Sequence, residues 1–251
     1  METVLSNVGN AAFNDPFYGW IDNEQIYFAD RNTGIRRIGV NERNLVLSTS
    51  DAKYDYFVQN NRLEYYGNPW QYGAMNACFA KADGLWYWGK TYGGGGIFRF
   101  AESDISPVDI SRGTNPPYAT IFPDEFVKSF VIDATNQILY AVIRDKGLYA
   151  VPLTDITAND ATKTNTKAES KYLVASFKSD SEGSVGEYVD VCQMVLDSSD
   201  GSVYFGLRAE EGSSETSGVK RWNPTMKKLE TIVSGANVYG IELNNELSNL
   251  F

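Results

Sequence analysis

A three-strand segment recurs four times along this chain of 251 residues. Each copy has an apolar strand ending near an acid, a polar turn, an aromatic strand, a Gly-rich or charged turn, and a third strand that opens with Gly. The four copies span 20–38, 79–100, 130–151 and 194–222. We predict a fourth strand after each copy, at 44–50, 106–111, 171–177 and 228–234. Four-stranded units that repeat every ~40–60 residues are typical of β-propeller blades.

The spacing of the repeat sets the expected number of blades. Equivalent tyrosines of the second strands lie 60, 53 and 64 residues apart, at Tyr27, Tyr87, Tyr140 and Tyr204. The first gap also holds residues 54–67, which we interpret as two strands of a degenerate copy, and 237–251 begins another. The sequence therefore predicts one all-β propeller domain over residues 1–251, with six blades or with five.

The two ends of the chain resemble each other. Residues 1–10 are similar to residues 229–237, where an outer strand precedes a new blade. We therefore expect the strand at 1–7 to pair with the blade that begins at 237–251. A blade shared by the two termini closes a propeller and leaves no sheet edge open.

Composition agrees with a β-rich globular domain and excludes several functions. Aromatic residues make up 14% of the chain, which favours strands. The net charge of −10 argues against nucleic-acid binding. No run approaches the ~18 apolar residues of a membrane helix, so we expect no membrane insertion. No signal peptide is visible after Met1, and the compartment stays open.

The chain has no histidine, which excludes Ser-His-Asp triads, His bases and His-ligated metals. Its two cysteines, Cys78 and Cys192, lie in apolar runs, and we interpret them as buried small side chains rather than a disulfide or a reactive thiol. We expect no metal site and no cofactor. The expected partner is a protein, peptide or glycan ligand, bound by a monomer.

The stretch IYFADRNTGIRRI (26–38) resembles the repeat of YWTD-type β-propellers, in which a Tyr-Trp-Thr-Asp-like strand precedes a strand with Ile-x-Arg. Residues 85–100 and 139–151 are looser versions. The Asp that follows the aromatic strand is missing elsewhere, where Lys90, Arg144 and Arg208 stand instead. The resemblance implies a six-bladed propeller with a binding or scaffold role, usually outside the cytoplasm.

Acidic residues offer two sharper interpretations. Asp22, Asp133 and Asp197 share the position at the end of a first strand, where they could bind a cation, but Asp at such a position is a common turn-former, and we favour that role. Residues 12–28 resemble the start of five-bladed propeller glycosidases, in which an Asp-Pro carboxylate, here Asp15, acts as nucleophile or base. A glycosidase also needs a second carboxylate, and no Arg-Asp-Pro-like segment follows. The enzyme is therefore the alternative, and we assign no catalytic residue.

A repeated cation suggests where a ligand would bind. Arg31, Arg144 and Arg208 each follow an anchor tyrosine by four residues, and Lys90 follows Trp86 by four, so each cation shares a side of its strand with an aromatic residue. The turns that enter the blades add the aromatic residues Phe17, Tyr18, Trp70, Tyr72, Phe126 and Tyr188. One hypothesis is that these residues form a rim that binds an anionic glycan or acidic peptide. The structural interpretation, which we favour, is that each cation pairs with an acid such as Asp30, Asp145 or Glu210 and only holds blades together.

Overall fold

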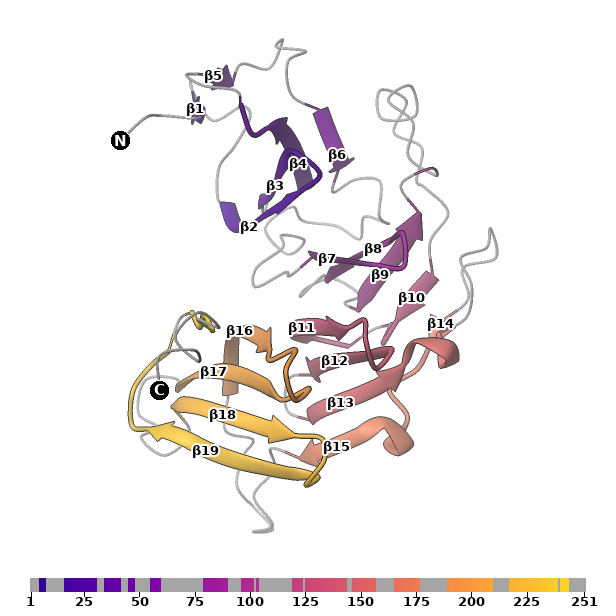
Figure 1. Ribbon diagram of the computed structural model, residues 1–251, viewed down its shortest axis with the longest axis vertical. Helices are drawn as coiled ribbons and strands as arrows, with labels where there is room; N and C mark the ends of the chain where they lie inside the picture. Colours follow the sequence, from indigo (N-terminus) through magenta and orange to yellow (C-terminus); the bar gives the residue numbers. More distant parts are fainter. Residues whose placement is uncertain are drawn as a thin grey trace. The chain divides into compact units, whose positions relative to one another are not determined.

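The computed structural model describes residues 5–7, 16–30, 34–41, 45–47, 55–59, 79–89, 96–101, 103, 119–123, 125–143, 146–156, 165–176, 189–209, 217–238 and 240–243. The fold is all-β and propeller-like (Figure 1). The described residues form four blades, each a sheet built on four antiparallel strands, and not the predicted six or five. Two compact units hold two blades each, residues 1–126 with 157–166 and residues 127–156 with 167–251.

The first unit contains blades one and two. Blade one has the order β2-β3-β4-β6, with strands Pro16–Asp22, Gln25–Asp30, Gly34–Gly39 and Asp55–Gln59. Blade two contains β7 to β10, with strands Phe79–Ala82, Leu85–Gly89, Ile97–Ala101 and Ala119–Ile121. The short strand β14 (Asn165–Thr166) adds to β10 in parallel, and β1 (Leu5–Asn7) pairs in parallel with β5 (Leu45–Leu47).

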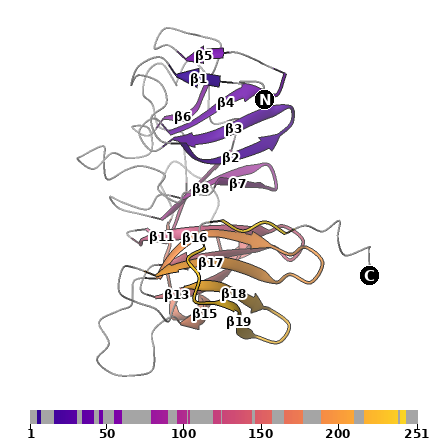
Figure 2. The same cartoon turned by 90° about the vertical axis from the view of Figure 1, so that its left-hand side faces the viewer.

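The second unit contains blades three and four, whose strands run in chain order from one edge to the other (Figure 2). Blade three consists of β11 (Val127–Asp133), β12 (Ile138–Ile143), β13 (Gly147–Pro152) and β15 (Leu173–Ser176). Blade four consists of β16 (Val189–Leu196), β17 (Val203–Ala209), β18 (Gly218–Asn223) and β19 (Lys228–Ser234). Two 3-10 turns, η4 (Leu153–Asp155) and η5 (Ser170–Tyr172), flank β14 in the chain.

Most of the predicted strands are confirmed. All four copies of the repeat fold as three consecutive antiparallel strands, and the fourth strands predicted at 171–177 and 228–234 are β15 and β19. The prediction for 106–111 falls largely outside the described residues, and β10 takes the fourth position of blade two.

The fourth strand of blade one was assigned to the wrong segment. Residues 55–59, predicted to start a degenerate copy, pair with β4 as its outer neighbour, while the predicted strand at 44–50 contributes β5 to a separate pair. Both segments have the composition of a strand, and the pairing with β4 identifies 55–59 as the outer strand.

The predicted closure of the chain ends stays a prediction. Residues 5–7 pair in parallel with β5, and residues 239 and 244–251 of the predicted partner segment lie outside the described residues.

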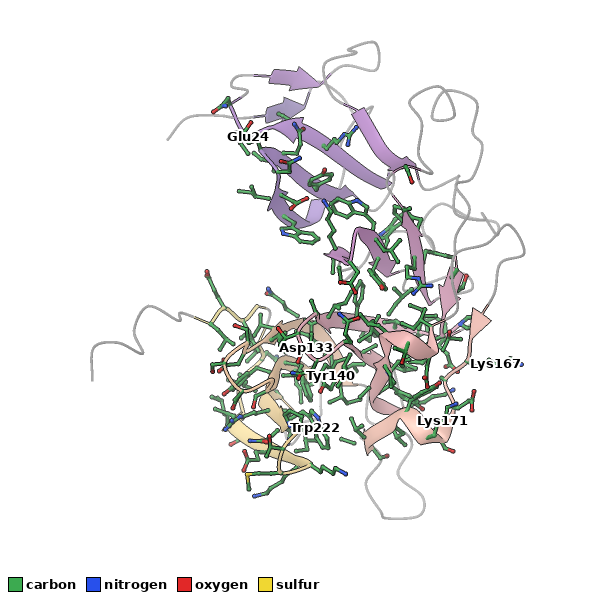
Figure 3. The ribbon with its side chains drawn as sticks, turned by 45° about the vertical axis from the view of Figure 1, so that its right-hand side comes forward. Glu24, Asp133, Tyr140, Lys167, Lys171 and Trp222 are labelled. Atoms are coloured by element: carbon green, nitrogen blue, oxygen red, sulfur yellow. The ribbon has the colours of Figure 1, made fainter. Side chains whose placement is uncertain are left out.

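Within each unit the core lies between its two blades. In the first unit, Trp86 of β8 is fully buried, with its ring 4.6 Å from the ring of Tyr27 and 5.5 Å from that of Trp20. In the second unit, Tyr140 of blade three and Trp222 of blade four belong to one buried cluster (Figure 3). Equivalent tyrosines of blades one and three therefore pack against the following blade.

Candidate functional site

Most of the predicted rim lies outside the described residues. This holds for Arg31, Lys90, Trp70, Tyr72, Arg144 and Tyr188. Phe17 and Tyr18 lie in β2, and Arg208 lies in β17, where the register places it opposite Asp190. Phe126 is 42% exposed, in agreement with its expected position in an entering turn. The rim as a binding site stays a prediction. The two cysteines give no further information, because Cys78 lies outside the described residues and only the backbone of Cys192 is described.

The acids at the ends of the first strands have structural roles. Asp133 is buried, and its carboxylate accepts hydrogen bonds from the backbone N–H of Asn136 at 2.9 Å and from the Asn136 side chain at 2.7 Å. Asp197 accepts the backbone N–H of Ser199 at 2.9 Å. The preferred interpretation of these two acids as turn-formers is confirmed.

Asp22 makes a different contact from the other two acids. Its carboxylate lies 2.7 Å from the ammonium group of Lys81 in β7, and this ion pair joins blades one and two. Lys81 also lies over the ring of Trp86, 5.2 Å from its centroid. Among the residues that the structure describes, no three His, Cys, Asp or Glu side chains gather closely enough to hold a metal ion.

The structure shows a second series of cations, which we did not single out from the sequence. The backbone register places Tyr27 opposite Arg37, Tyr87 opposite Arg99, and Tyr204 opposite Arg221. Direct cross-strand neighbours lie on the same face of a sheet. Each of these arginines stands three residues after a glycine, and blade three has Ala150 at this position. The sequence signal for these arginines was therefore a Gly-x-x-Arg pattern at the start of the third strand. This pattern overlaps the Ile-x-Arg of the YWTD-type repeat, which residues 26–38 resemble.

These Tyr–Arg pairs differ in exposure. Tyr87 and Arg99 are both buried. Burial raises the pKa of Tyr87 above its usual value. A hydrogen bond from Arg99 lowers this pKa, but its effect is smaller than that of burial. Burial and the nearby charge of Asp133 also raise the pKa of Tyr140, so we expect both phenols to stay neutral at physiological pH.

The pair in blade four belongs to a partly exposed polar network. The guanidinium of Arg221 lies 2.6 Å from the Asp200 carboxylate and 3.8 Å from that of Glu230, and it covers the ring of Tyr204 at 5.7 Å. Its Nε donates to the Ser202 hydroxyl at 3.1 Å. With its charge balanced by two acids, Arg221 has little capacity left for an anionic ligand.

The pKa of Asp200 makes the stability contributed by this network depend on pH. Desolvation raises its pKa, but hydrogen bonds from Ser202 and Arg221 outweigh this and hold the pKa below the model-peptide value of 3.8. The folded state therefore binds the proton less tightly than the unfolded state. The resulting stability is present above pH about 4 and is lost as the pH falls through the lowered pKa.

We expect Asp200→Asn to cost less than about 1 kcal/mol at pH 7, because the ion pair is partly exposed. The difference from the unaltered protein should shrink as the pH falls below about 4, because the unfolded state then takes up a proton, and the folded carboxylate follows below its lowered pKa. Urea denaturation between pH 7 and pH 3 measures both effects. A difference that grows on acidification would contradict the assignment.

A second feature of blade four is a covered face. Cross-strand register places two rows of residues on one side of the sheet, opposite the core with blade three. We call these residues the outer face of blade four: Gln193, Val195, Tyr204, Gly206, Val219, Arg221 and Glu230. Val238 and Ile241 lie against it, because both are close neighbours of Gly206 and the side chain of Gln193 accepts a hydrogen bond from Ile241. This is the most completely described candidate for a docking surface.

Comparisons with known proteins support the fold. The chain is similar to a structure described as the extracellular domain of a one-component system from B. thetaiotaomicron, with 14% identity and a TM-score of 0.52 over 92% of this chain and 25% of that one. A second structure, described as the extracellular domain of a hybrid two-component system from the same organism, gives 12% identity and a TM-score of 0.50 over 89% and 26%.

A carbohydrate-active enzyme of family AA12 from Trichoderma reesei is also similar, with 10% identity and a TM-score of 0.50 over 94% of this chain and 57% of that one. The chain thus spans about a quarter of the first two proteins and over half of the third. At these identities the similarity shows the fold alone. No protein-family model matches the chain, and no curated protein matches it. The described residues include no helix long and apolar enough to cross a membrane.

Proposed function

We propose that this chain is a non-catalytic binding module that acts outside the cytoplasm, and that its repeats are of the YWTD type. One observation supports the non-catalytic assignment. Four acids of the described residues are engaged in the sheets themselves: Asp22 with Lys81, Asp133 with Asn136, Asp197 with Ser199, and Asp200 with Arg221. Asp15, the carboxylate of the glycosidase alternative, lies outside the described residues. A general acid or base needs a carboxylate that is free to exchange a proton with substrate.

Two further points support the proposal. The Ile-x-Arg part of the YWTD-type repeat has a structural counterpart, because Arg37 and Arg99 each stand opposite an anchor tyrosine. The extracytoplasmic location is proposed by analogy with the two extracellular domains of similar fold. The ligand we propose is an anionic glycan or acidic peptide, bound by the rim of Arg31, Lys90, Arg144 and Arg208 and its aromatic residues.

A triple substitution of Arg31, Arg144 and Arg208 by Gln tests the rim. If the cations bind the ligand, affinity for a sulfated hexasaccharide or a hexaglutamate peptide should fall about tenfold or more, because hydrogen bonds between charged groups contribute ~1.5–3 kcal/mol each. The melting temperature should change little. Titration calorimetry and thermal unfolding monitored by circular dichroism measure the two quantities.

A matched control removes the same number of positive charges elsewhere. Lys167, Lys171 and Lys228 are exposed, and the first two are labelled in Figure 3. Their joint replacement by Gln should leave affinity within about twofold, because only the non-specific attraction between charges changes. A large loss of stability with unchanged affinity in the Arg31, Arg144 and Arg208 variant would instead support a structural role for the cations.

A further inference from the structure

The outer face of blade four holds a later segment of the chain that does not join the sheet as a strand. After β19 ends at Ser234, Val238 and Ile241 lie against Gly206 of β17, and Ile241 also bonds Gln193 of β16. These residues have no strand or helix assignment where they are described. The contacts are therefore made by particular side chains and backbone groups, and these can be examined one by one.

Gly206 provides space for an apolar side chain of the segment. A Cβ atom added at Gly206 would lie 2.7 Å from Cγ1 of Val238 and 3.4 Å from Cγ1 of Ile241. Cβ atoms do not approach other atoms as closely as 2.7 Å, so the contact exists only because residue 206 has no side chain. The backbone of Gly206 is not in the left-handed region, so the chain does not need a glycine there to form a turn. The glycine instead leaves the space that Val238 occupies.

Two backbone N–H groups of the segment find acceptors on the blade. The N–H of Val238 donates to the backbone carbonyl of Leu207 at 3.2 Å. The N–H of Ile241 donates to Oε1 of Gln193 at 3.1 Å. Spaced three residues apart, these bonds fix the register of the segment on the sheet. The Gln193 side chain recognises peptide backbone here, because its amide oxygen accepts a hydrogen bond from any N–H group.

We propose that the outer face of blade four is a docking surface for a short apolar peptide, and that residues 237, 238 and 240–243 of the same chain occupy it in the isolated protein. The partner is a peptide with a β-branched side chain for the space above Gly206 and a backbone N–H three residues later for Gln193. Arg221 is balanced by Asp200 and Glu230, so the surface selects an apolar peptide rather than an anionic one. One rim residue of the proposed function, Arg208, follows Gly206 by two positions on β17, and the two proposals are distinguished by their ligands, one apolar and the other anionic.

A pair of compensating substitutions in the full chain tests the contact with the segment. Gly206→Ala should push Val238 out and raise the hydrogen-exchange rates of the Val238 and Ile241 amides about tenfold or more. Val238→Ala in the same chain removes the colliding Cγ1 and should restore most of the protection. Gly19→Ala is the matched control, because a Cβ there would meet only the carbonyl oxygen of Tyr27 at an ordinary 3.8 Å.

The amides of β12 and β13, in the other blade of the same unit, report whether the variants fold. Equal exchange rates at residues 237–243 in the unaltered protein and in a folded Gly206→Ala variant would overturn the proposal. Protection of this segment that rises with protein concentration would also overturn it, because a second copy would then supply the peptide.

A synthetic peptide with the sequence of residues 235–243, GANVYGIEL, tests binding from outside. In full-length protein carrying Val238→Asp, the chain's own segment is weakened, and the labelled peptide should bind at least about tenfold more tightly than to the unaltered protein. Adding Gly206→Ala should abolish this binding, and a peptide with Asp in place of its Val should not bind. Failure of GANVYGIEL to bind the Val238→Asp variant would contradict the proposal. Neither result bears on the anionic rim, which is tested with different ligands.

Discussion

Replacing Gly147 or Gly218 by Ala is expected to destabilise the second unit by about 3 kcal/mol or more. Each glycine opens the third strand of its blade, with φ of +143° at Gly147 and +142° at Gly218. A Cβ atom at these positions would collide with a backbone carbonyl oxygen of the fourth strand, that of Ala175 or that of Val233. Neither oxygen can move without breaking the pairing of β13 with β15 or of β18 with β19. Urea denaturation followed by tryptophan fluorescence measures the loss.

Gly84→Ala separates the steric collision from the cost of a positive φ. Gly84 has φ of +75° in the turn between β7 and β8, but no atom lies within 4 Å of an added Cβ. We expect this variant to lose only about 1–2 kcal/mol. If Gly147→Ala and Gly218→Ala cost no more than Gly84→Ala, the close approach of the third and fourth strands is wrong.

Trp86→Ala is expected to destabilise the first unit by about 3–5 kcal/mol. The Trp86 ring is fully buried and packs between the two blades of that unit, against Tyr27 and Trp20 of blade one and under Lys81. Its removal leaves a cavity and takes a cation–π partner from Lys81. Hydrogen exchange of β3 and β8 measures the local loss, and exchange of β12 and β17 shows whether the second unit depends on the first.

Two companion variants make the Trp86 result specific. Trp86→Phe keeps an aromatic ring between the blades and should cost clearly less than the alanine. Ile21→Ala removes a side chain that is 64% exposed on blade one and should stay within about 0.5 kcal/mol of the unaltered protein. A loss for Trp86→Ala as small as that for Ile21→Ala would contradict the packing of blade one on blade two.

The sequence predicted the inner three strands of each blade because aromatic strands, polar turns and glycines recur in a fixed order. It predicted outer strands less well. For blade one, both 44–50 and 54–59 have the character of strands, and only backbone pairing in three dimensions decides that β6 takes the edge of β4. The pairing of β1 with β5 was missed for the same reason, because no local pattern indicates it.

The contacts of the candidate sites were also hard to predict from the sequence, because they depend on pairing between strands. The period-two pattern of a strand indicated cations four residues after three of the anchor tyrosines and, in blade two, four residues after Trp86. Cross-strand register instead brings Arg37, Arg99 and Arg221 beside those tyrosines, and this depends on hairpin geometry that the sequence shows only indirectly. Likewise, the contact of Val238 with Gly206 joins residues whose proximity no local pattern indicates.

The central claim, that the chain binds a ligand without converting it, is tested most directly by one titration. The full chain is mixed with a sulfated hexasaccharide, and calorimetry records binding while the proton NMR spectrum of the sugar records its chemical state. We predict saturable binding and a hexasaccharide that is recovered unchanged. New anomeric signals from cleaved sugar, present with the unaltered protein and absent with Asp15→Asn, would contradict the claim and establish the glycosidase instead.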